Sequence, residues 1–86
     1  MRKITFSDLG WEHYLWWQKQ DRKILKRINS LICECSRTPF EGTGKPEPLK
    51  YQLKGWWSRR VTDSDRLVYR CNDDEVEIAY LRGHYD

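Results

Sequence analysis

The sequence contains little cysteine, and the few thiols present exclude several kinds of site. Its 86 residues include three cysteines, an odd number whose spacing fits no zinc site. Cys33 and Cys35 lie two residues apart in a helical pattern, so their side chains point in different directions. We therefore interpret all three as small core or surface thiols of a reducing compartment.

Long apolar runs are also lacking. No stretch approaches the length of a membrane span, and no charged and then apolar leader is present. We therefore expect a cytoplasmic protein with no membrane partner. Internal repeats, linkers and low-complexity regions are lacking as well, so residues 1–86 are predicted to form a single domain. No metal-ligand spacing and no arrangement around a nucleophilic Ser or Cys is present, and we expect no cofactor.

Aromatic residues and positive charge are what the chain does have. Aromatics make up 14% of the residues, including five Trp, which is enough for a modest core. The net charge of +3 is unevenly spread. Residues 44–70 hold seven basic and three acidic side chains, whereas the remaining residues hold nine basic and ten acidic ones. A local basic field of this kind favours a polyanionic partner, although a solvated sheet face with arginines for solubility is the alternative.

Local patterns predict strands, helices and turns in the order βαα, loop, βββ. Residues 3–6 alternate as a short strand, and Ser7 or Asp8 provides an N-cap for a helix that ends near Gln20. Asp21 is a second N-cap, before a helix with one clear apolar stripe. The residues of that stripe are Ile24, Leu25, Ile28, Leu31, Ile32 and Cys35.

The second half of the chain is predicted to be a loop followed by strands. All three prolines lie in residues 36–48, which excludes a helix and a central strand there, and Phe40 is expected to anchor this loop on the core. Residues 56–61 and 66–70 flank the polar cluster 62–65 as a hairpin, and residues 75–82 alternate as a further strand. The fold class is therefore α+β, with two helices on one face of a mostly antiparallel sheet of four to five strands. The other face stays open and cationic.

Several side chains on these segments could carry chemistry. Pro46 and Pro48 restrict the backbone on both sides of Glu47, which holds one carboxylate near Lys50, although an exposed loop glutamate is the simpler interpretation. Strand arginines and a terminal His-Tyr pair add cations and a potential acid. They are Arg60, Arg66, His84 and Tyr85. His13 is interpreted as an exposed or capping side chain of the first helix.

The same segments resemble one known family. The matching runs are residues 37–42, residues 44–50, Gly55-Trp56-Trp57-Ser58-Arg59-Arg60, Arg66-Leu67-Val68-Tyr69 and the terminal His84-Tyr85. This combination resembles the YoeB/Txe toxins of the RelE superfamily over essentially the whole chain. The resemblance implies a RelE-like, microbial-ribonuclease-type fold. It also implies the toxin of a type II toxin–antitoxin pair, a metal-independent mRNA interferase that cuts mRNA in the ribosomal A site.

The resemblance also implies partners and roles. The partners are a YefM-like antitoxin, the ribosome and its mRNA, and a homodimer is left open because relatives can dimerise. The family's functional positions fall on Glu47, Lys50, Arg60, Arg66, His84 and Tyr85. Glu47 is assigned as general base, His84 as general acid and Arg66 as the group facing the transition-state charge, with the others assisting. Basic residues expected to contact RNA are Lys45, Lys54, Arg59 and Arg70.

Two other functions fit the basic face. One is a non-catalytic module that binds RNA or the ribosome, and the other is a protein-binding subunit whose arginines dock an acidic partner. Asp86, beyond the terminal His-Tyr, departs slightly from the family pattern. Its carboxylate could raise the pKa of His84.

Overall fold

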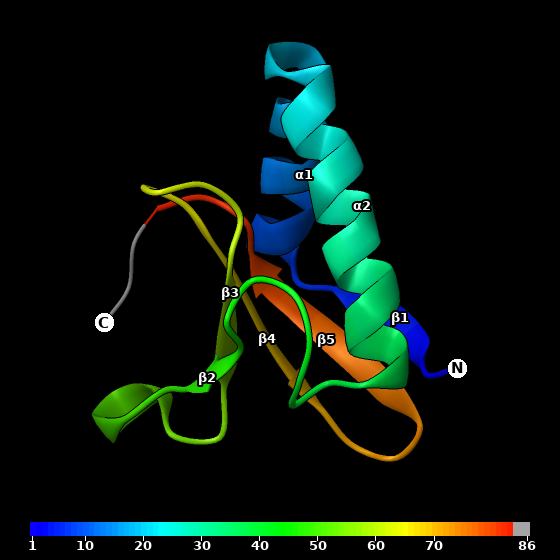
Figure 1. The fold of residues 1–86 in the computed structure, drawn as a ribbon, viewed down its shortest axis with the longest axis vertical. Helices are drawn as coiled ribbons and strands as arrows, with labels where there is room; N and C mark the ends of the chain where they lie inside the picture. Colours follow the sequence, from blue (N-terminus) through cyan, green and yellow to red (C-terminus); the bar gives the residue numbers. More distant parts are fainter. Residues whose placement is uncertain (84–86) are drawn as a thin grey trace.

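Two antiparallel helices cover one face of a five-stranded sheet (Figure 1). The computed structural model describes residues 1–83 of the chain. Its elements are β1 (Lys3–Phe6), α1 (Asp8–Gln20), α2 (Arg22–Arg37), β2 (Glu47–Pro48), a 3-10 turn (Tyr51–Leu53), β3 (Trp57–Arg60), β4 (Arg66–Cys71) and β5 (Glu75–Tyr80). The predicted order βααβββ is confirmed, with one addition: a two-residue edge strand, β2, inside the proline-containing loop.

The sheet order is β1-β5-β4-β3-β2. β1 pairs with β5 in parallel, and the other three pairings are antiparallel. The mixed sheet therefore matches the predicted class. No helix among residues 1–83 is both long and apolar enough to cross a membrane.

The helices begin where the sequence predicted. The side chain of Ser7 accepts a hydrogen bond from the Gly10 amide, and Asp21 accepts from the Lys23 and Ile24 amides. The apolar stripe of α2 then lies over the sheet, where Ile28 and Leu31 are fully or almost fully buried. The core joins residues of both helices to residues of β4 and β5.

The last strand is shorter than predicted. Alternation favoured a strand over residues 75–82, but β5 ends at Tyr80. A register shift lies between Val68 and Tyr69 in β4, where Val68 pairs with Tyr80 and Tyr69 pairs with Ile78. Beyond this bulge Leu81 leaves the sheet, because its backbone groups bond to side chains of α1.

Candidate active site

The register of three strands brings the predicted base and two cations onto one face of the sheet. Glu47 of β2 pairs with Ser58 of β3, which in turn pairs with Val68 of β4. Directly paired residues share a face, and so do residues two apart in a strand. Arg60 lies two residues after Ser58 in β3 and pairs with Arg66 of β4. Both arginines therefore lie on the same side of the sheet as Glu47. The helices cover the opposite side.

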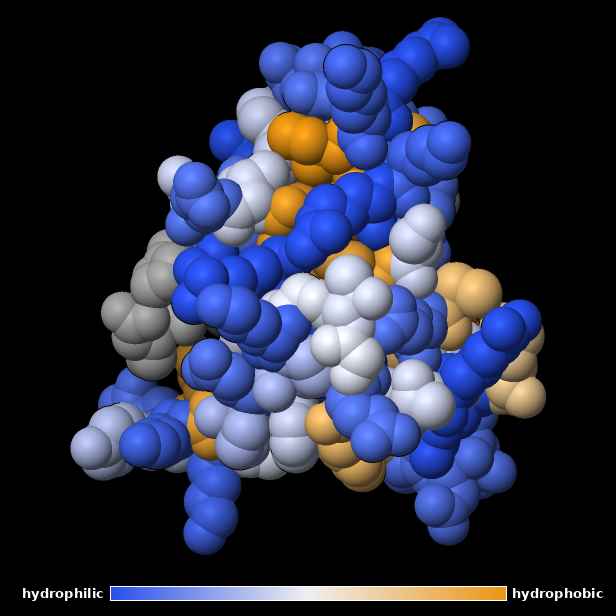
Figure 2. Space-filling model, in the orientation of Figure 1, coloured by the Kyte–Doolittle hydropathy of each residue, from blue (hydrophilic) through white to orange (hydrophobic). Residues whose placement is uncertain are grey.

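Glu47 and Arg60 are both exposed, as the chemistry of an open site requires. The view from the helix side in Figure 2 is mostly hydrophilic, with hydrophobic residues in separate small patches. Lys45, Lys50 and Lys54 are exposed on the same loop as Glu47. Lys45 has a positive φ of 53°, and Lys50 leads into the 3-10 turn. The loop therefore presents the Glu47 carboxylate among several ammonium groups.

Arg66 is less free than the sequence indicated. Its exposed fraction is only 9%, and Nη1 donates to the carbonyls of Thr62 at 2.8 Å and Asp65 at 3.1 Å, with a longer contact to Asp63. The guanidinium group thus closes the β3–β4 turn with one nitrogen. No hydrogen bond to a residue within 1–83 engages Nε or Nη2 of Arg66.

Arg59 corrects one of the sequence predictions. We expected Arg59 to contact RNA, but its side chain is completely buried on the helix side of the sheet. It donates to the carbonyls of Thr38, Glu41 and Thr43 at 2.6, 3.0 and 3.1 Å. It also lies 3.2 Å from the Glu34 carboxylate of α2. Arg59 therefore organises the loop that leads to Glu47 and has no surface to offer RNA.

Glu34 of α2 and Tyr69 of β4 also hydrogen-bond to the loop that leads to Glu47. Glu34 accepts from the amide of Thr43 at 2.6 Å, and this hydrogen bond, with help from Arg59, holds the pKa of Glu34 below its ordinary value despite some desolvation. Burial raises the pKa of Tyr69, so its hydroxyl stays protonated and donates to the Pro39 carbonyl. Phe40 packs against Trp57 at 4.7 Å between ring centroids, yet 54% of Phe40 stays exposed. It anchors the loop at the edge of the core.

Glycine is required at one point of this loop. Gly42 has a φ of +120°, and a Cβ there would lie 1.9 Å from Oε1 of Glu34. The close approach lets Glu34 reach both Arg59 and Thr43. Sequence reasoning singled out the loop that carries Glu47 but missed Glu34 and Tyr69 as its supports, because their contacts join residues far apart in the chain.

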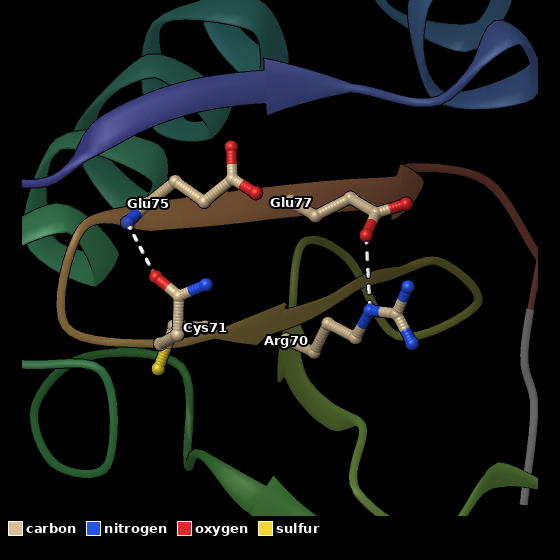
Figure 3. A pocket seen from close by; sticks show the side chains of 5 residues that line it. Arg70, Cys71, Glu75 and Glu77 are labelled. Carbon is tan, nitrogen blue, oxygen red and sulfur yellow. Dashed lines mark hydrogen bonds and ion pairs between the residues drawn. The ribbon is translucent and has the colours of Figure 1, made fainter.

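Arg70 lies on the open face, as expected for an RNA contact, but it already has protein partners. Its guanidinium group lies 4.4 Å from the ring centroid of Trp56, and Nε bonds to Glu77 at 2.9 Å. Figure 3 shows the Arg70–Glu77 ion pair. The two residues line a pocket of about 280 Å³ together with Cys71, Asn72 and Glu75. The Arg70 side chain remains 56% exposed, so it can still meet a phosphate at the rim of the site.

The predicted acid, His84, and its neighbour Tyr85 lie outside the described residues. The described chain ends at Gly83, whose carbonyl accepts from the Arg66 amide at 2.9 Å and whose amide donates to Asp65 at 2.9 Å. Gly83, the last described residue, therefore lies directly beside the backbone of Arg66.

Comparisons with solved structures define the class of fold. The YoeB dimer from Staphylococcus aureus superposes with a TM-score of 0.91 at 42% identity, covering 98% of both chains. The YoeB–YefM complex from the same organism gives 0.88 at 41% identity, covering 99% of both chains. The architecture is thus that of a small bacterial toxin with two helices on a mixed sheet.

Sequence comparison gives the family. Toxin YoeB of Escherichia coli K12 is 54% identical over 83 residues, which are 96% of this chain and 99% of that protein. The family model for the YoeB-like toxin of bacterial type II toxin–antitoxin systems matches residues 6–85. The chain belongs to this family of YoeB-like toxins.

Proposed function

We propose that this toxin is a ribosome-dependent mRNA endoribonuclease that cuts mRNA in the ribosomal A site and so stops translation. One observation carries the proposal. The sheet register places Glu47, Arg60 and Arg66 on one face that the helices leave open, and Arg66 is bonded to the residue that precedes His84. An acid–base pair around a cationic floor is what cleavage of a phosphodiester needs.

RNA supplies its own nucleophile, the 2′-hydroxyl. In the proposed reaction Glu47 removes the 2′-hydroxyl proton, and the oxygen attacks the adjacent phosphorus. The bond from phosphorus to the 5′ oxygen breaks, and His84 protonates that leaving oxygen. The products are a 2′,3′-cyclic phosphate or the 3′-phosphate formed from it, and a 5′-hydroxyl. Each proton-transfer role contributes roughly 10²–10⁴-fold to the rate.

The cations divide into two groups. Arg66 uses its remaining nitrogens, with Arg60 beside it, for the non-bridging oxygens as they gain charge in the transition state. Lys50 assists, and Tyr85 orients the nucleotide. Lys45, Lys54 and Arg70, which are exposed, hold the flanking phosphates through attraction that salt weakens.

A YefM-like antitoxin and a second copy of the chain are the proposed protein partners. The relative from S. aureus has been solved both as a dimer and in complex with YefM. An acidic antitoxin segment across the open face would cover Glu47 and Arg60 and so block the site.

The test is controlled expression in bacteria with mapping of cuts in ribosome-bound mRNA, comparing wild type with His84→Ala. The proposal predicts cuts at A-site codons whose upstream fragments end in a cyclic or 3′-phosphate, and their loss in His84→Ala. Ribosome association should persist in the variant. Upstream fragments that end in a 3′-hydroxyl would refute the mechanism. Ribosome binding and growth arrest without any cut would instead favour the non-catalytic binding module.

A further inference from the structure

The backbone of Leu81 is held on both sides by side chains of α1. Its amide donates to Nδ1 of His13 at 3.0 Å, and its carbonyl accepts from Nε1 of Trp17 at 2.9 Å. Leu81 is itself fully buried, and it lies just beyond the end of β5. The ladder between β4 and β5 ends with Tyr80, one residue beyond a bulge at Ala79 of β5, so these two side chains bond backbone groups that the ladder no longer pairs.

The next two residues are held by other distant groups. The guanidinium group of Arg82 lies 3.6 Å from the ring centroid of Trp16, and Gly83 bonds through both backbone groups to Asp65 and Arg66. In Figure 1 the segment after β5 runs from the base of α1 to the β3–β4 turn. Residues 81–83 are thus fixed one by one, immediately before His84.

Terminal segments fray unless they are tied down, and a general acid must stay within hydrogen-bond reach of the oxygen that it protonates. We propose that His13 is a positioning residue for the cleavage reaction: its neutral imidazole holds Leu81 and thereby fixes the segment that leads into His84. This inference rests on the proposed nuclease function. It adds a residue on the first helix, remote in sequence from Glu47 and the arginines.

The proposed role depends on the protonation state of His13. Nδ1 accepts a hydrogen bond only in the neutral imidazole, and protonation of Nδ1 would place two donors face to face with the loss of this bond. The charged groups around His13 are Arg82 from the segment after β5, Glu12 from α1 and Asp65 from the β3–β4 turn, and the Tyr80 ring lies 6.5 Å away. Burial and then Arg82 lower the pKa of His13 below its ordinary 6.5, outweighing the two carboxylates. The hydrogen bond from the Leu81 amide to His13 is therefore present at neutral pH and is lost on acidification.

The chain offers variants that separate positioning from simple stability. His13→Leu removes the acceptor. His13→Asn keeps an acceptor, because its Oδ1 is bonded to Cγ as Nδ1 is, but it does not titrate. Tyr14→Phe is the matched control. It removes a different hydrogen bond of α1, the one from the Tyr14 hydroxyl to Asn29 at 2.7 Å, which does not touch residues 81–83.

The experiment measures three quantities for wild type and each variant: single-turnover cleavage of ribosome-bound mRNA, affinity for the ribosome, and hydrogen exchange at the Leu81 amide. We expect His13→Leu to speed Leu81 exchange and to lower the cleavage rate about threefold to tenfold, the range for one lost hydrogen bond, with unchanged affinity. His13→Asn should restore the rate. Tyr14→Phe should lower thermal stability while it leaves the cleavage rate unchanged.

A His13→Leu variant that cleaves at the wild-type rate overturns the inference and leaves the proposed function standing. A wild type that cuts no ribosome-bound mRNA overturns the proposed function, and the inference with it. If His13→Leu does not fold, wild type and His13→Asn are compared as pH falls from about 7.5 to about 5.5. The ratio of their rates should shift in favour of His13→Asn, and a constant ratio refutes the role of His13.

Discussion

Arg59 of β3 lies 3.2 Å from Glu34 of α2, and this pair ties the second helix to the sheet beneath the loop that carries Glu47. Arg59 is fully buried, and its guanidinium group also satisfies three loop carbonyls. The precision of the exposed site therefore depends on a charge hidden on the opposite face of the same strand.

Replacing Arg59 by Met should destabilise the protein by about 3 kcal/mol or more, because it leaves three carbonyls without their donor and removes one of the two partners of the Glu34 carboxylate. Chemical denaturation measures the change. Arg60→Met is the matched control, since Arg60 is adjacent but exposed on the other face. Equal stability of the two variants would show that Arg59 does not organise the loop.

The Glu34 carboxylate should make stability fall at acid pH. Its folded pKa is depressed mainly by the Thr43 amide, so the unfolded chain binds the proton more readily. The resulting stabilisation is fully present above the ordinary pKa of 4.5 and is lost as pH falls through the lower folded value. Glu34→Gln should reduce this acid dependence in thermal melts between about pH 3 and 6. An unchanged dependence would contradict the assignment.

Gly10→Ala tests the contact between α1 and β5. At an exposed position inside a helix, alanine stabilises the helix by about 1 kcal/mol relative to glycine. A Cβ at Gly10, however, would lie 2.4 Å from the backbone carbonyl oxygen of Ile78, which no side-chain rotation relieves. We expect net destabilisation of about 1–3 kcal/mol, measured by denaturation, against a neutral Gln18→Ala at an exposed position of the same helix. A stabilised Gly10→Ala would show that the helix shifts at little cost.

The two site arginines should respond differently to truncation. Arg60→Ala should lower cleavage of ribosome-bound mRNA by about 10²–10³-fold with little change in melting temperature, because Arg60 is exposed. Arg66→Ala should lower both quantities, since Nη1 also closes the β3–β4 turn. Arg70→Ala provides a control at the rim, where weaker ribosome binding is expected with a near-normal cleavage step. An Arg60→Ala protein that melts far below wild type would contradict the expectation that Arg60 contributes to cleavage and not to stability.

The sequence predicted those features that depend on short-range patterns. Both N-caps and the apolar stripe of α2 follow from residues three or four positions apart, and the β3–β4 hairpin follows from a polar turn between two short strands. Arg59 was misjudged because its charge suggested the surface, although in a strand it shares one face with Trp57 and Val61, which the structure places on the core side. Its burial becomes favourable only through Glu34 and the loop carbonyls, and such long-range partners leave no periodic signal.

The same reason explains what else was missed. The two-residue strand β2 is too short to show alternation. The hydrogen bonds of His13 and Trp17 to Leu81 join residues more than sixty positions apart in the chain. Arg60 and Arg66 lie on the open cationic face that the sequence predicted, and the unforeseen pairing of β2 with β3 brings Glu47 to the same face. The roles of His84 and Tyr85, outside the described residues, stay predictions that rest on the resemblance.

The central claim is that Glu47 acts as the base of an RNA-cleaving site, and the single-turnover rate of Glu47→Gln on ribosome-bound mRNA tests it most directly. Glu41→Gln, which changes another exposed carboxylate of the same loop, is the control. The account predicts a loss of about 10²–10⁴-fold for Glu47→Gln, with unchanged stability and ribosome affinity, and a near-normal rate for Glu41→Gln. A Glu47→Gln toxin that cuts mRNA as fast as the Glu41→Gln control would contradict it.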